Sequence, residues 1–235
     1  MRLHHEHPWN LEPKHAIALQ NQLREFVITK DDLPAEIKSV AGVDVGFESN
    51  GTVTRAAVVV LRLPDLHVID RAVAKIPTGF PYIPGLLSFR EIPAILKALA
   101  KLDSLPDLLL CDGQGYAHPR RFGIACHLGL LTNIPSLGVG KTRLIGEHPI
   151  VPDRRGAWVP LTHQGEGIGA VLRSRVGVKP VYISSGHRIS LETSLHYVMQ
   201  CTTRFKLPET TRQAHRLASP GGFSVAGSLF RGQHS

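Results

Sequence analysis

The hydrophobic pattern in the first third of the chain predicts three consecutive strands. Runs rich in β-branched residues cover residues 39–47, 53–63 and 67–76, and an Asn-Gly pair at positions 50 and 51 separates the first two. A short turn of this kind joins strands that pair antiparallel. The segment therefore predicts an antiparallel meander.

A loop and a helix are predicted next. Residues 77–85 are rich in proline and glycine, and residues 86–102 carry apolar side chains spaced three and four apart. Pro93 fits the first turn of a helix better than its interior, so the helix is expected to begin there or to be kinked. Ser88 and Glu91 have the spacing of a capping box, which marks a helix start.

The rest of the chain alternates between short apolar runs and helical patterns. Strands are predicted at 107–111, 136–139, 157–161, 168–173 and 180–184, and helices at 121–131, 191–201 and 209–218. The first two of these strands are expected to be parallel, because a helical crossover joins them. The whole order predicts an α/β protein whose mixed central sheet, three antiparallel strands and then parallel strands, is flanked by helices, as in the ribonuclease H-like fold. We expect one domain over residues 1–235, with a mobile tail at 219–235.

Composition narrows the class of protein. The chain has 235 residues, of which 43% are hydrophobic, and no apolar run is long enough for a membrane helix. We therefore expect a soluble, cytoplasmic monomer with no membrane partner. The 27 basic and 19 acidic residues give a formal charge of +8, which suits a polyanion such as nucleic acid, although many basic proteins bind none. Three cysteines without C-x-x-C spacing predict buried apolar side chains rather than disulfides or a zinc site.

Three carboxylates stand where a carboxylate is locally unfavourable. Asp44 interrupts an apolar strand, Asp112 ends the apolar run 108–111 in a glycine-rich loop, and Glu91 stands just before or within the first turn of the long helix. At one end of the sheet they would offer oxygen ligands to a hard cation such as Mg²⁺. Each has an ordinary alternative, as a ladder partner, an Asx turn or a helix cap. The coincidence of all three carboxylates with this order of strands and helices favours the metal site over the ordinary alternatives.

Two further side chains are candidates for the same site. His215 lies in the last predicted helix, where a lone histidine is more often a surface or packed residue than a ligand. Lys141 ends a Gly-Val-Gly-Lys segment, but a Walker phosphate loop would need glycine where Pro135 stands, so we discount a nucleotide triphosphatase. Lys141 remains a candidate cation for a backbone phosphate or for the transition state.

Three longer motifs resemble the endonuclease V family. They are residues 41–45 (AGVDV), 81–91 (PYIPGLLSFRE) and 112–121 (DGQGYAHPRR). The segments 133–141 and 184–187 match as well, so the likeness extends from about residue 10 to residue 218. The Tyr-Ile-Pro-Gly segment combined with the Asp-Gly-x-Gly-x-x-His-Pro segment is highly specific.

The resemblance implies an enzyme that recognises hypoxanthine, the deamination product of adenine. Such an enzyme hydrolyses the second phosphodiester bond on the 3′ side of the lesion and leaves 3′-hydroxyl and 5′-phosphate ends. By position, Asp44, Glu91 and Asp112 become the metal carboxylates, Lys141 becomes the phosphate-contacting cation, and His215 becomes a fourth ligand or a water-positioning residue. The family varies at the position of His215, where an aspartate also occurs. The implied cofactor is Mg²⁺, with Mn²⁺ as a substitute.

The resemblance also implies a surface that binds nucleic acid. Residues 81–85 match the family's strand-separating wedge, and the residue types agree, because the prolines stiffen the loop and Tyr82 can fill the space of an extruded base. Residue types alone would favour an ordinary surface loop. The glycine-rich loops would line a tight purine pocket, with plain tight turns as the alternative. The arginines at 120 and 121 could equally contact phosphate or begin a helix. The candidate DNA-binding residues are Tyr82, Pro84, Gly85, Leu87, Gly113, His118, Gly138, Arg120 and Arg121.

Two alternatives to a DNA-cleaving enzyme stay open. A non-catalytic module that recognises damage would need lysine and arginine contacts but no carboxylates. An inosine-specific endoribonuclease would depend on contacts to the 2′-hydroxyl, which a sequence does not place. Inosine-containing DNA is the expected partner, since the chain lacks a recognisable RNA-binding extension, and single-stranded DNA or RNA are the other candidates.

Overall fold

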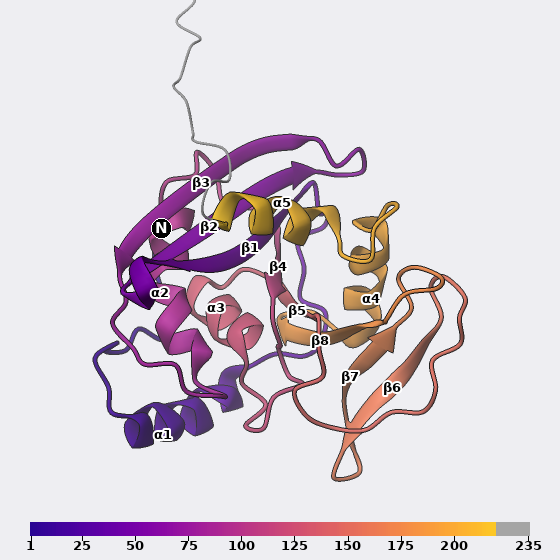
Figure 1. The fold of residues 1–235 in the computed structure, drawn as a ribbon, viewed down its shortest axis with the longest axis horizontal. Coiled ribbons are helices and arrows are strands. Elements are labelled where there is room, and N and C mark those ends of the chain that lie inside the picture. Colours follow the sequence, from indigo (N-terminus) through magenta and orange to yellow (C-terminus); the bar gives the residue numbers. More distant parts are fainter. Residues whose placement is uncertain (220–235) are drawn as a thin grey trace, which may run out of the picture.

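A single eight-stranded sheet organises the chain (Figure 1). The computed structural model describes residues 1–219, and the strands run in the order β3-β2-β1-β4-β5-β8-β7-β6. The antiparallel meander expected from the sequence is present as β1 (Ser39–Glu48), β2 (Val53–Arg62) and β3 (Val68–Pro77). The strands β4 (Leu108–Asp112) and β5 (Ser136–Gly140) extend the sheet parallel to β1, as expected.

The last three strands complete the sheet in the antiparallel sense. β8 (Val181–His187) pairs antiparallel with β5, and β7 (Glu166–Leu172) and β6 (Trp158–His163) follow it. The parallel part of the sheet is therefore limited to β1, β4 and β5. Figure 1 shows the long strands β1 to β3 at one end of the sheet and the β6–β7 hairpin at the other.

Helices cover both faces of the sheet. The helices α2 (Leu87–Leu99) and α3 (Ile124–Thr132) pack on one face, and α4 (Leu191–Gln200) and α5 (Glu209–Ala218) on the other. Because side chains alternate along a strand, neighbouring residues of β1 and β4 enter different apolar cores. This architecture confirms the expected mixed sheet flanked by helices. All three cysteines are buried and free, as expected.

Two helices differ from the sequence-based expectation. The helix α1 (Pro13–Leu23), followed by a short 3₁₀ turn (Arg24–Phe26), was not foreseen, because it buries only Ala16, Gln20 and Leu23. In α2 the expected capping box does not form: Leu86 is the N-cap, Ser88 bonds His127 instead, and Glu91 lies beyond the first turn. The helix also continues through Pro93.

A second 3₁₀ turn, Ser49–Gly51, joins β1 to β2 at the expected Asn-Gly pair. Among residues 1–219, no helix is long and apolar enough to cross a bilayer. The tail expected at the end of the chain falls outside the described residues except for Ser219.

Candidate active site

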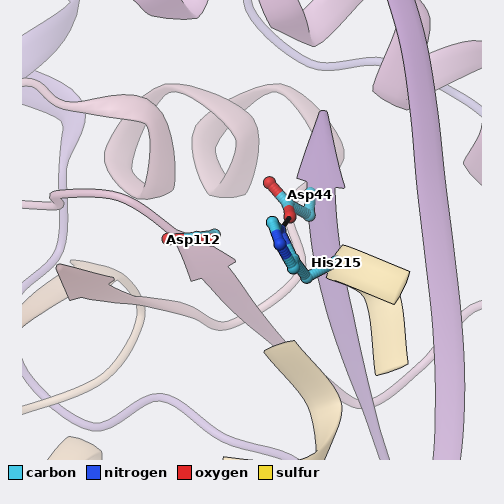
Figure 2. A group of neighbouring side chains, drawn as sticks. All are labelled: Asp44, Asp112 and His215. Atoms are coloured by element: carbon cyan, nitrogen blue, oxygen red, sulfur yellow. Dashed lines mark hydrogen bonds and ion pairs between the residues drawn. The ribbon is translucent and has the colours of Figure 1, made fainter. Parts of the chain in front are cut away.

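Three of the candidate residues meet at the end of β4. Asp44 on β1, Asp112 at the end of β4 and His215 on α5 each offer a ligand atom, and these atoms all lie within 4.8 Å of one another. The pairing of the two strands explains part of this, since Val43 is registered with Cys111 and the two aspartates come next. Figure 2 shows Asp44 and His215 directed toward each other, with Asp112 beside them at the end of its strand.

Two glycines bring α5 close enough to complete the group. Gly42 and Gly46 lie on the same face of β1 as Asp44, since side chains alternate along a strand. A Cβ atom at Gly42 would come within 2.0 Å of the Thr210 carbonyl oxygen, and one at Gly46 within 2.5 Å of the Ala218 carbonyl oxygen. Only glycine allows this close approach of helix to strand. The Gly-x-Asp-x-Gly segment of β1 is therefore the place where the last helix packs on the strand.

Hydrogen bonds orient the Asp44 carboxylate. Its Oδ2 lies 2.7 Å from Nδ1 of His215, and its Oδ1 accepts a hydrogen bond from the backbone N–H of Val45 at 2.8 Å. The carboxylate side chain is 12% exposed, whereas the imidazole is 59% exposed. Because an ionised carboxylate only accepts hydrogen bonds, Nδ1–H of His215 is the donor in this contact, and the other ring nitrogen, Nε2, is left for a further contact.

Glu91 reaches the same place from α2, on the opposite layer. The group of three ligand residues does not include Glu91, but the charges of its two aspartates affect the titration of the Glu91 carboxyl group. Burial, followed by the negative charges of Asp44 and Asp112, raises the pKa of Glu91 to about 8. Burial and Asp44 also raise the pKa of Asp112, against the opposing effect of Lys141. The negative charges of the carboxylates in the site are therefore only partly balanced by the positive charge of Lys141.

Lys141 forms an ion pair with Asp112. It follows the end of β5, the strand adjacent to β4, and Asp112 is registered with Val139. The lysine side chain is 40% exposed and the aspartate side chain 12%. The lysine side chain is therefore more accessible to solvent than the carboxylate with which it pairs.

A cavity of about 350 Å³ opens beside these side chains. Its walls combine the carboxylates of Glu91 and Asp112 with loops from three parts of the chain. Of the candidate DNA-binding residues, the cavity is lined by Tyr82, Pro84, Gly85, Leu87, Gly113 and His118. The sequence-based set and the cavity thus overlap in most members, although binding by these residues remains a prediction.

The other three candidates lie elsewhere. Gly138 supports the loop after β4, since a Cβ atom there would come within 2.5 Å of the Gly115 nitrogen. Arg120 donates hydrogen bonds to Gln20 and to the Gly85 carbonyl. Arg121 is tied to Glu166 and to the His118 carbonyl. Phosphate contacts by the two arginines stay a prediction, and both guanidinium groups already have partners within the chain.

Gln114 is a cavity residue that sequence reasoning missed. Its Nε2 donates to the Thr142 carbonyl at 3.0 Å, whereas its buried Oε1 has no hydrogen-bond partner within residues 1–219. The side chain packs directly on Gly140, where a Cβ atom would be 2.2 Å from Nε2. Its position inside the Asp-Gly-Gln-Gly motif was the available signal.

Known proteins of one family resemble this chain in sequence and in structure. A family model described as Endonuclease V matches residues 21–216. Endonuclease V from Nostoc sp. is 60% identical over 93% of this chain and 99% of its own length. The crystal structure of the Streptomyces avermitilis endonuclease V is 40% identical, with a TM-score of 0.85 over 93% of this chain and 96% of that one.

A further solved structure contains a nucleic acid. A point variant of the Ciona intestinalis endonuclease V, crystallised with a 23mer DNA containing an inosine followed by a ribo-adenosine, is 27% identical, with a TM-score of 0.76 over 88% of this chain and 97% of that one. These likenesses, together with the sheet order, confirm the expected ribonuclease H-like fold. This chain belongs to the endonuclease V family.

Proposed function

We propose that this protein is a Mg²⁺-dependent endonuclease that cleaves DNA beside deoxyinosine. The bond hydrolysed is the second phosphodiester bond on the 3′ side of the lesion, and the products carry 3′-hydroxyl and 5′-phosphate ends. The observation that carries the proposal is the meeting of Asp44, Asp112 and His215 at the edge of a cavity lined by glycine-rich loops. Carboxylates beside a base-sized cavity suit a metal-dependent nuclease better than a module that only binds.

The residues present fit a divalent cation. Two carboxylates and an imidazole offer ligand atoms within 4.8 Å of one another. Burial, and then repulsion from neighbouring carboxylates, raises the pKa values of Glu91 and Asp112, and a bound cation relieves such repulsion. Asp44 and Asp112 would hold Mg²⁺, with Glu91 and His215 as further ligands or supports. Once bound, Mg²⁺ or Mn²⁺ would polarise the scissile phosphate and acidify the attacking water.

The chain's own groups supply the remaining functions. His215 donates from Nδ1 to Asp44, so its exposed Nε2 can accept a hydrogen bond from the attacking water and orient it. Lys141 lies on the solvent side of Asp112, where its ammonium group would meet a phosphate entering the site. The cavity would take the hypoxanthine base, whose edge backbone amides of the glycine-rich loops can read.

The test is cleavage of a labelled duplex that contains one deoxyinosine. We expect a single nick one nucleotide beyond the lesion with Mg²⁺, none with EDTA, and none in an undamaged duplex. An RNA of the same sequence is included because the Ciona crystal substrate carries a ribonucleotide after the inosine. Faster cleavage of that RNA would make the protein an endoribonuclease. Tight binding without cleavage under any divalent metal would make it a recruiting module.

Substitution of the carboxylates separates catalysis from binding. We expect Asp44→Asn and Asp112→Asn to abolish nicking while much of the DNA affinity is retained, since neither change removes a basic side chain. Asp103→Asn, an exposed residue remote from the group of three, is the matched control. Unchanged nicking by either active-site variant would overturn the metal assignment.

A further inference from the structure

The loop between β3 and α2 is fixed at both ends and projects in the middle. Phe80 and Leu86 are buried in a small apolar cluster that also contains Ala16 of α1. Arg90 holds the first end by donating from Nη1 to the Phe80 carbonyl at 3.0 Å. Between these anchors, Tyr82 is 68% exposed and lies at the cavity. The loop therefore exposes the aromatic ring of Tyr82 between two ends that are fixed to the rest of the protein.

The second end is held through one carbonyl oxygen. The Gly85 oxygen accepts hydrogen bonds from Nε2 of Gln20 at 3.1 Å, from Nε2 of His118 at 3.1 Å and from Nη2 of Arg120 at 2.7 Å. A carbonyl oxygen has two lone pairs, so three donors saturate it and fix the direction of the peptide group. Gly85 has a φ of +79°, which glycine adopts without a steric penalty.

The three donors also hold one another. Arg120 donates from Nε to Oε1 of Gln20 at 2.5 Å, and its backbone N–H donates to Nδ1 of His118 at 3.2 Å. Since Nδ1 of His118 accepts, Nε2 is the nitrogen that donates to Gly85. Gln20 is 1% exposed and donates also to the Phe122 carbonyl at 3.2 Å. Because each donor is fixed by another group, the carbonyl cannot turn without breaking several bonds at once.

We infer that Gln20, His118 and Arg120 are positioning residues that keep residues 81–85 rigid, and that this rigidity sets activity on duplex DNA. The inference rests on the proposed function. A loop that takes the place of a base must resist the stacking and pairing energy of that base, which amounts to a few kcal/mol. A single-stranded substrate has no pair to open, so it needs no such resistance. Arg120 then acts through Gly85 and not as a phosphate contact.

The test compares two substrates in one variant. Gln20→Met keeps the side-chain volume but removes every hydrogen bond of Gln20, and Gln22→Met, an exposed position on the same helix, is the matched control. We expect nicking of an inosine duplex by Gln20→Met to fall about tenfold relative to the control, while nicking of the inosine single strand changes less than about twofold. A thermal melt of each variant shows that the comparison is made on folded protein.

A second set of measurements distinguishes positioning from phosphate contact. Arg120→Met, and the double variant that combines Gln20→Met with Arg120→Met, should each lose no more duplex activity than Gln20→Met alone. Both substitutions break the same hydrogen-bond network, so their effects should not add. Arg120→Lys, which retains one donor, should recover part of the duplex activity. The slope of log affinity against log salt should be unchanged in Arg120→Met, whereas loss of a phosphate contact would reduce it by about one.

Three outcomes would overturn the inference. They are equal losses on both substrates, no loss on either, and additive losses in the double variant together with a reduced salt slope. Failure of the proposed function looks different, because the unaltered protein would then cleave neither inosine substrate.

Discussion

Removal of the Glu91 carboxyl group should make the protein more stable in the absence of metal and less active in the presence of Mg²⁺. Glu91 has a pKa of about 8, raised by burial and by the charges of Asp44 and Asp112. A carboxyl group of an unfolded chain titrates near 4.5. The folded state therefore keeps a proton that the unfolded chain releases, and stability is lost as pH rises from 4.5 to about 8. Glu91→Gln has no proton to release and escapes this loss.

The magnitude follows from the two pKa values. One pKa unit corresponds to about 1.4 kcal/mol, so the difference in unfolding free energy between Glu91→Gln and the unaltered protein should grow from about 1 kcal/mol at pH 5 to about 3 kcal/mol at pH 7. For a chain of this size, about 3 kcal/mol corresponds to about 6–12 °C in melting temperature. Nicking in Mg²⁺ should meanwhile fall at least about tenfold.

Urea unfolding in EDTA across pH 5 to 8 measures the effect. The growth of the difference with pH is the diagnostic quantity, because any change in packing or hydrogen bonding adds a constant offset. Glu192→Gln, an exposed residue of α4, controls for the loss of one negative charge. A difference that stays constant between pH 5 and pH 8 would refute the account of the carboxylate cluster.

Three further predictions test the rest of the site and the fold. Gly42→Ala should destabilise the protein by about 1–3 kcal/mol and reduce nicking, since its Cβ atom would displace α5, whereas Gly167→Ala, a strand glycine with open space around it, should change little in either assay. Mg²⁺ at about 100 times its dissociation constant should stabilise the protein by about 2.7 kcal/mol, and thermal melts of Asp44→Asn should show no such gain. Burial, then the charges of Arg188 and His5, lowers the pKa of His187 to about 4, so stability should fall as pH drops from about 6.5 to 4, and His187→Gln should flatten that fall in acid unfolding.

Local sequence patterns predicted most of the sheet because hydrophobic periodicity and turn chemistry determine where strands begin and end. The meander, the short strands after it and the last two helices all lie where the patterns put them. The direction of β8 relative to β5 was not readable, because pairing depends on how the chain returns across the sheet. Helix α1 was missed for a different reason: it faces a small apolar cluster, so its own apolar stripe is weak.

Asp44 and Asp112 were readable from the sequence because each interrupts or ends an apolar strand, and Glu91 was readable from the family motif in which it stands. The groups that support these carboxylates have no such local signal. Gln20 reads as an ordinary polar residue in a segment where no helix was predicted, and only the fold shows that it is buried against Gly85. Gly42 reads as a weak strand residue, and only the packing of α5 shows why a side chain is excluded. Residues of the candidate metal site can therefore be recognised in a single sequence when they are unusual for their local structure. Residues that position them can be recognised only when the fold brings distant segments together.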